Sequence, residues 1–351
     1  MSASVHIWGY GARTPLGMAA QPSAAACRAG IAAIRAHPFF VDASGESLRG
    51  AFDPLLDPAL VGPQRLLALA ETALREGCEP LVGVTGVGGS VPLFLALPEP
   101  RPGFGADEVQ ALRAGLAQLR QLPLPLGEIA ATAQGHAAGF AMLALACDRI
   151  RRGEIALALV GGVDSYFCPE TIEWLDSNRQ IVSARARSAF VPGEGAGFCL
   201  LAGDVLTQRR GAASMGRLRC VALAREQHLI KTNDLCLGVG LTAVVDDAMS
   251  RLANEERRVQ SIFCDINGER YRAEEWSYVC LRLPQYFDDP TAYRSPADSW
   301  GDMGAASAPL FAMLASQAAL RGYAAGARSL LWASSEGGLR GAAVLETSGP
   351  R

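Results

Sequence analysis

The feature that most constrains the fold is a helical pattern followed directly by a fully apolar segment. Residues 139–152 alternate bulky and small side chains with helical spacing, and Gly153 ends the pattern. Residues 155–160 are apolar without interruption and lead into Gly161 and Gly162. A strand without polar alternation is buried on both faces, as in parallel or mixed sheets covered by helices. The segment therefore predicts an α/β protein.

The same alternation recurs along the chain and predicts a duplicated core. In the first half the expected elements are a strand at 5–8 with a turn at 9–11, a helix from 65 that ends at Gly77, a strand at 81–84, and a proline-rich loop or lid at 93–105. In the second half they are strands at 218–224, 262–266, 329–333 and 341–346, with helices near 241–252 and 305–320. Loops are expected to dominate 180–188 and 284–298. Two alike halves fit a five-layered α/β core better than one open sheet.

Charge, cysteine usage and hydropathy exclude several classes of protein. The net charge is −3, and the 32 basic residues form no run or face that would follow phosphates, so nucleic acid is not an expected partner. The nine cysteines include no CxxC pair, which favours small buried side chains in a reducing compartment. No apolar run reaches the ~18 residues of a membrane span, and no signal peptide is evident. We expect a cytoplasmic protein.

Two kinds of ligand site are also disfavoured. Gly9 and Gly11 could begin a dinucleotide-binding turn, but the third glycine and the later acidic residue that such a turn needs are absent. His6, His37 and His228 have no partners at metal-ligand spacing. The sequence therefore predicts neither a metal nor a cofactor.

Four strings, in order along nearly the whole chain, resemble the β-ketoacyl synthase (thiolase-fold) family. Residues 7–17, IWGYGARTPLG, are similar to the family's "ITGxGxxTPLG". Residues 150–165 resemble the helix end and strand that follow the family's nucleophile, and 189–197, AFVPGEGAG, match "GFVxGEGAG". Residues 335–338 with 342–346 resemble "GFGGTNAxxVLE". The resemblance implies a thiolase-like αβαβα fold of two ketosynthase-like halves, 1–203 and 204–351.

The family's chemistry needs a cysteine nucleophile, and the resemblance finds none here. The thiolate at a helix N-terminus takes an acyl group as a thioester, and two histidines assist decarboxylation of a malonyl unit. A gapless count back from Gly153 places His136 at the cysteine position, whereas anchoring on residues 132–133 places Gln134 there. Cys147 lies three helical turns further on and cannot substitute.

The other family positions are changed as well. The first histidine, of "VNAHGTGT", aligns with Asn267, and the second, of "KSxxGHxxGAA", falls near Asp302, with that motif's lysine absent. The phenylalanine of "GFGG" aligns with Glu336. The resemblance assigns four residues to the pocket wall: Glu336, Gly337, Gly338 and Glu194.

His136 has two interpretations. A helix N-terminus disfavours the imidazolium, so we expect a neutral ring that caps its helix or is hydrogen-bonded in a remodelled pocket. If the fold brings His136, Asn267, Asp302 and Glu336 together, they form a new polar site in which the carboxylates and the imidazole shift one another's pKa values.

Two functions follow from the resemblance. The first is a non-catalytic scaffold, companion subunit or adaptor, since family members without the cysteine serve as partners, as chain-length factors do in polyketide assembly. Such a chain would form a homodimer or a ketosynthase-like heterodimer, and would serve an acyl-carrier protein system or a secreted toxin. The second is an atypical acyltransferase or decarboxylase with its remodelled pocket around His136. Glutamine at position 134 would favour decarboxylation, but decarboxylating relatives keep both histidines.

Overall fold

Ten strands form one mixed sheet in the computed structural model, which describes residues 4–84, 89–210 and 213–348. From one edge to the other they are β5 (Leu126–Ala133), β4 (Val91–Leu97), β6 (Leu157–Ser165), β7 (Glu194–Gly203), β1 (Val5–Arg13), β8 (Gly216–Arg225), β12 (Leu339–Glu346), β11 (Arg328–Ser334), β9 (Ser261–Cys264) and β10 (Tyr293–Arg294).

The sheet consists of two halves with the same topology. The order β5-β4-β6-β7-β1 in the first half is repeated as β10-β9-β11-β12-β8 in the second. In both halves the first three strands are parallel and the last two pairings are antiparallel. The expected α/β fold with two alike halves is confirmed. The halves are not separate sheets, however, because β1 and β8 pair antiparallel at three residues and join them.

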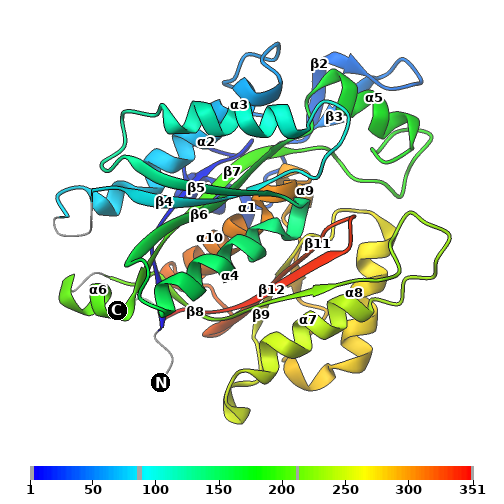
Figure 1. Ribbon diagram of the computed structural model, residues 1–351. Helices are drawn as coiled ribbons and strands as arrows, with labels where there is room; N and C mark the ends of the chain where they lie inside the picture. The colour runs from blue at the N-terminus through cyan, green and yellow to red at the C-terminus, as the bar shows by residue number, and fades with distance from the viewer. Residues whose placement is uncertain (1–3, 85–88, 211–212, 349–351) are drawn as a thin grey trace.

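Helices cover both halves and fill the space between them, which gives five layers (Figure 1). The outer helices of the first half are α2 (Gly62–Gly77) and α3 (Ala106–Ala117), and those of the second half are α7 (Val239–Ser250) and α8 (Arg270–Arg282). Between the halves lie α4 (Ala138–Arg151) and α10 (Ser307–Leu320). The α10 helix is buried on nearly all sides, as expected of a helix that is apolar all round.

Shorter elements decorate this core. They are the helices α1 (Ala20–Arg28), α5 (Pro169–Ser177), α6 (Asp204–Arg210) and α9 (Ala297–Trp300), and a hairpin of β2 (Arg35–Val41) and β3 (Ser47–Gly50). Single 3-10 turns lie at Glu79–Leu81, Gly135–Ala137, Asn254–Glu256, Pro284–Tyr286 and Gly304–Ala306. No helix of the described segments is long and apolar enough to cross a membrane.

Three expectations about the first half were wrong. The turn expected at 9–11 is part of β1, because Gly11 lets the strand pack directly on α2: a Cβ there would lie 1.7 Å from the carbonyl oxygen of Ala73. The segment 81–84 is not a strand, since a 3-10 turn and a loop occupy it. The expected loop at 93–105 is a buried strand up to Leu97, and only its proline-rich remainder is irregular.

Candidate functional site

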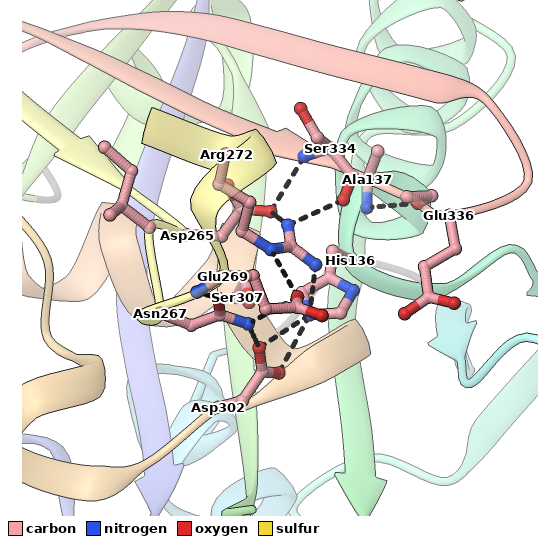
Figure 2. Close-up of polar contacts among 12 residues, drawn as sticks. His136, Ala137, Asp265, Asn267, Glu269, Arg272, Asp302, Ser307, Ser334 and Glu336 are labelled. Atoms are coloured by element: carbon pink, nitrogen blue, oxygen red, sulfur yellow. Dashed lines mark hydrogen bonds and ion pairs between the residues drawn. The ribbon is translucent and has the colours of Figure 1, made fainter. Parts of the chain in front are cut away.

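His136 lies at the junction of β5 and α4, where the sequence places the family's nucleophile. The strand ends at Ala133, and a 3-10 turn that begins at Gly135 with φ +68° leads into the helix. The His136 side chain is 8% exposed, and its Nε2 lies 2.8 Å and 3.0 Å from the two carboxylate oxygens of Asp302 (Figure 2). The ring is therefore held by a buried carboxylate.

Asp302 is the centre of this cluster. It precedes the turn that begins α10, and its Oδ1 accepts hydrogen bonds from the Tyr166 hydroxyl at 3.0 Å and from the backbone N–H of Gly304 at 2.8 Å. Its Oδ2 accepts a hydrogen bond from the Asn267 side-chain amide. The structure thus brings together His136, Asn267 and Asp302, which come from three segments far apart in the sequence.

An arginine that the motif comparison did not single out completes the cluster. The Arg272 guanidinium is fully buried, pairs with Asp265 and with Glu269 at 3.2 Å, and places one nitrogen 3.3 Å from Nε2 of His136. It also donates to the carbonyl oxygen of Ser334 at 2.8 Å. The spacing of Glu269 and Arg272, three residues apart at the start of α8, is the sequence signal that would have indicated this pair.

The pKa values of His136 and Asp302 are shifted in opposite directions. Burial alone would raise the pKa of Asp302, but the positive charges of His136 and Arg272 outweigh burial and lower it far below its usual range. Burial alone would lower the pKa of His136, but the Asp302 carboxylate reverses this and raises it. The Asp302 carboxylate thus favours the protonated ring, which is the opposite direction to the neutral ring expected from the helix N-terminus. His136 and Asp302 form an ion pair when the ring is protonated, and a hydrogen bond otherwise.

A polar cavity of about 470 Å³ opens beside His136. Gln134, Glu336 and Gly337 also line it, as expected of a pocket at this end of the strands. Charged and aromatic side chains that the motifs did not predict make up much of the remaining wall: Glu99, Arg101, Asp164, Tyr166, Trp174 and Arg225. The volume is within the range of small-molecule sites.

Glu99 occupies the backbone donors of the segment that aligns with "GFGG". Its carboxylate accepts hydrogen bonds from the backbone N–H groups of Glu336 at 3.2 Å and Gly337 at 2.8 Å. Burial raises the pKa of Glu99, and the nearby negative charge of Glu336 acts in the same direction. The Glu99 carboxyl group therefore occupies both of these backbone N–H donors, so they are not free to bind an oxyanion in the cavity.

Glu336 does not join the cluster around Asp302. Its carboxylate pairs with the ammonium group of Lys231, which also lies 3.0 Å from Glu269. Lys231 is the only lysine of the chain, and it links one wall of the cavity to the Arg272 network. Of the four residues expected to form one polar site, three are in contact and the fourth is tied to Lys231.

Two of the residues assigned to the pocket wall have structural positions instead. Glu194 is fully buried and pairs with Arg65 through contacts of 2.5 Å and 2.6 Å, while it also accepts the backbone N–H of Asp53 at 2.7 Å. Gly338 adopts φ +95° and accepts the backbone N–H of Glu226 at 2.8 Å. Neither residue lines the cavity beside His136.

None of the nine thiols provides a nucleophile at this site. No cysteine lines the cavity, and burial raises the pKa of every one, to about 12 for Cys147 in α4. A thiol with a raised pKa is protonated at neutral pH and reacts slowly.

One group of side chains has the composition of a metal site. Glu226, Cys236 and Glu275 offer ligand atoms within 4.8 Å of one another. Glu275, however, already pairs with the buried Arg340 at 3.0 Å, and Glu226 accepts the backbone N–H of Gly240 at 2.7 Å. These ligands have protein partners, and burial raises the pKa of the Cys236 thiol to about 11. The donor set therefore does not fit a cation.

The fold is that of solved ketosynthase structures, and part of the sequence matches a ketosynthase family model. Residues 130–204 match the family model "Beta-ketoacyl synthase, N-terminal domain", and no protein of curated function matches the chain. Among solved structures, a type II polyketide ketosynthase chain from the complex of AntDE and the acyl-carrier protein AntF is similar, with a TM-score of 0.79, 13% identity, and coverage of 99% of this chain and 100% of that chain.

Two further solved structures have the same fold as this chain. The ishigamide ketosynthase/chain length factor gives a TM-score of 0.78 at 19% identity, with coverage of 99% of this chain and 100% of that chain. The ketosynthase from module 6 of the bacillaene synthase of Bacillus subtilis 168 gives 0.75 at 15% identity, with coverage of 99% and 72%. The chain is therefore β-ketoacyl synthase-like: it has the ketosynthase fold over 99% of its length, and residues 130–204 match the family's N-terminal domain.

Proposed function

We propose that this chain is a non-catalytic, ketosynthase-like companion subunit that works in a complex with another protein of an acyl-chain-building system. The observation that carries the proposal is the state of the nucleophile position. On the gapless count His136 occupies it, and its Nε2 is engaged by both carboxylate oxygens of Asp302. An imidazolium in an ion pair has no free lone pair on that nitrogen with which to attack an acyl group.

The surroundings of His136 support the same conclusion. All nine thiols have raised pKa values, so no cysteine can replace the missing nucleophile. The Glu99 carboxyl occupies the amides of Glu336 and Gly337, which would have to be free to stabilise a developing oxyanion. The nucleophile and the donors for the oxyanion are thus replaced together.

The edge of the sheet supports a protein partner. Within the described residues β5 pairs only with β4, so its outer edge carries unpaired backbone groups. Residues 129–133, IAATA, are uncharged, and a flat, uncharged edge strand pairs readily with another chain. We propose that a ketosynthase-like chain, a second copy or a different subunit, adds a strand there. Two of the similar structures are described as a ketosynthase/chain length factor and as a ketosynthase with its acyl-carrier protein.

Mass spectrometry of the intact protein tests the loss of catalysis. The chain is incubated with acyl-CoA, with acyl-loaded carrier protein and with malonyl-loaded carrier protein, and an active ketosynthase serves as the positive control. We expect no covalent adduct and no release of carbon dioxide above the rate without protein. An adduct or a decarboxylation that disappears in His136→Ala but persists in His228→Ala would refute the proposal and support the alternative, an acyltransferase or decarboxylase centred on His136.

Light scattering after size-exclusion chromatography tests the companion role. We expect a dimer of this chain alone, or a heterodimer when it is co-expressed with a catalytically competent ketosynthase from the same gene cluster. A chain that stays monomeric at all concentrations, and that binds neither a ketosynthase nor a secreted toxin encoded beside it, contradicts the role. If the chain binds only the toxin, its proposed role changes from companion subunit of an acyl-chain-building system to adaptor for secretion.

A further inference from the structure

A second concave site lies at the C-terminal ends of α1 and α10, away from the His136 cavity. Two adjoining cavities, of about 270 Å³ and 420 Å³, share Ala24, Arg28 and Tyr323 as walls. Neither cavity has a lining residue in common with the His136 cavity. Volumes of this size suit a small molecule.

Three arginines from separate segments line these adjoining cavities: Arg28 lines both, Arg294 the smaller and Arg321 the larger. Arg28 is the last residue of α1, Arg321 directly follows α10, and Arg294 lies in the edge strand β10. Within the described part of the chain, none of the three side chains has a carboxylate within 4.0 Å or donates a hydrogen bond. The single acidic lining residue is Asp298, so the site has an excess of positive charge.

This arrangement is more than the usual enrichment of cations at helix ends. Arginine near a helix C-terminus is stabilised by the helix dipole, which accounts for the placement of Arg28 and Arg321. It does not account for Arg294, which is on a strand. Nor does the Arg28 guanidinium bond the last carbonyls of its helix; it lies over the Tyr323 ring, 3.8 Å from the centroid. Stacking holds that guanidinium in place while leaving its N–H groups free.

The smaller cavity also has an apolar part. Phe263 and Leu314, both at most 5% exposed, form the floor, and Ala24 lies beside them. A cavity with a cationic rim and an apolar floor is complementary to a molecule that carries a negatively charged head and an apolar body. Arginine recognises phosphate through paired, parallel N–H bonds, and the three guanidinium groups together with the Asp298 carboxylate leave two positive charges, which match the double charge of a phosphate monoester.

We propose that the cavities between α1 and α10 bind a small organic phosphate, with Arg28, Arg294 and Arg321 around the phosphoryl group and Phe263 and Leu314 against the apolar part. The proposal is independent of whether the His136 site is catalytic.

Calorimetry with three probes on the full chain tests the proposal. Phenyl phosphate carries both features of the expected ligand, inorganic phosphate carries only the charge, and phenol carries only the ring. We expect phenyl phosphate to bind more tightly than either of the others. The triple variant Arg28→Gln/Arg294→Gln/Arg321→Gln should weaken its binding at least tenfold, whereas the double variant Arg185→Gln/Arg187→Gln, which removes exposed arginines elsewhere, should bind normally.

The reactivity of Cys27 reports independently on where the probe binds, because Cys27 lines the smaller cavity. The rate of alkylation of Cys27, followed by peptide mass spectrometry, should fall when phenyl phosphate is present and should not change in the triple variant. Three results would overturn the proposal: no binding of phenyl phosphate, equal loss of binding in the control variant, or binding without protection of Cys27. Circular dichroism checks that both variants are folded.

Discussion

The Nε2 atom of His136 lies 2.8 Å from Oδ1 of Asp302, although 166 positions separate the two residues in the sequence. Both side chains are buried, and each shifts the pKa of the other toward the charged form. The pair connects the start of α4 with the turn that begins α10, the two helices packed between the halves of the sheet. It therefore acts as a link in the central layer as well as a feature of the candidate site.

Stability should depend on pH through this pair. The folded pKa of His136 is raised above the value of about 6.5 expected in the unfolded chain, so its contribution is complete below that pH and is lost as the pH rises through the folded pKa. The folded pKa of Asp302 is lowered, so its contribution is present above about pH 3.9 and is lost on acidification. Urea unfolding should give a free energy of unfolding that decreases as the pH is raised above 6.5.

The variant Asp302→Asn should remove most of that dependence. It leaves His136 and Arg272 without the carboxylate, and removal of one partner from a buried ion pair costs about 3 to 5 kcal/mol. NMR titration should show a lower pKa for His136 in the variant. The matched control is Asp234→Asn, which breaks the exposed pair of Asp234 with His228 and should change stability by no more than about 0.5 kcal/mol. An unchanged pKa of His136 would contradict the ion pair.

The GEGAG string, which resembles a ketosynthase motif, should contribute to stability through Glu194. Glu194, from the GEGAG string, forms a fully buried pair with Arg65 and also holds the backbone of Asp53. Glu194→Gln should lower the free energy of unfolding by about 3 kcal/mol. Glu71→Gln, which breaks the exposed pair of Glu71 with Arg75, should cost under about 1 kcal/mol. Equal costs in the two variants would mean that burial does not strengthen the Glu194 pair.

The sequence predicted the central elements and part of the site, for physical reasons that can be traced. The pattern at 139–160 predicted α4 and the strand after it, because periodicity and continuous hydrophobicity are local signals. The family resemblance aligned His136, Asn267 and Asp302 with the catalytic positions, and the fold brings the three side chains together. Glu99 was not predicted, because its partners at Glu336 and Gly337 are more than 230 positions away.

A glycine caused one of the errors in the predicted fold. The sequence around Gly11 was interpreted as a turn, although the missing side chain serves close packing of β1 on α2. A glycine can therefore mark either a turn or a close contact between elements, and a local sequence pattern cannot distinguish these two roles.

The thiols should be slow to react. Because burial raises the pKa of all nine, alkylation by iodoacetamide at pH 7 should be slower than that of a free cysteine at every position. The buried Cys147 should stay unmodified until the protein unfolds, whereas the half-buried Cys27, Cys168, Cys236 and Cys280 should react first as the pH rises. Peptide mass spectrometry over time gives each rate separately. A single thiol that reacts rapidly at pH 7 would point to a nucleophile and would weaken the proposed loss of catalysis.

Close packing of β6 against the turn that starts α10 should make Gly162 intolerant of a side chain. A Cβ at Gly162 would lie 2.1 Å from the carbonyl oxygen of Ala305, in the turn that starts α10, so either β6 or that turn must move. We expect Gly162→Ala to lower the free energy of unfolding by about 3 kcal/mol. Gly89→Ala is the matched control, because a Cβ there has no neighbour within 4 Å and its φ is not positive, and it should change stability by less than about 0.5 kcal/mol. Chemical denaturation of both variants measures the difference, and a Gly162→Ala protein as stable as the control would show that β6 and α10 can separate without cost.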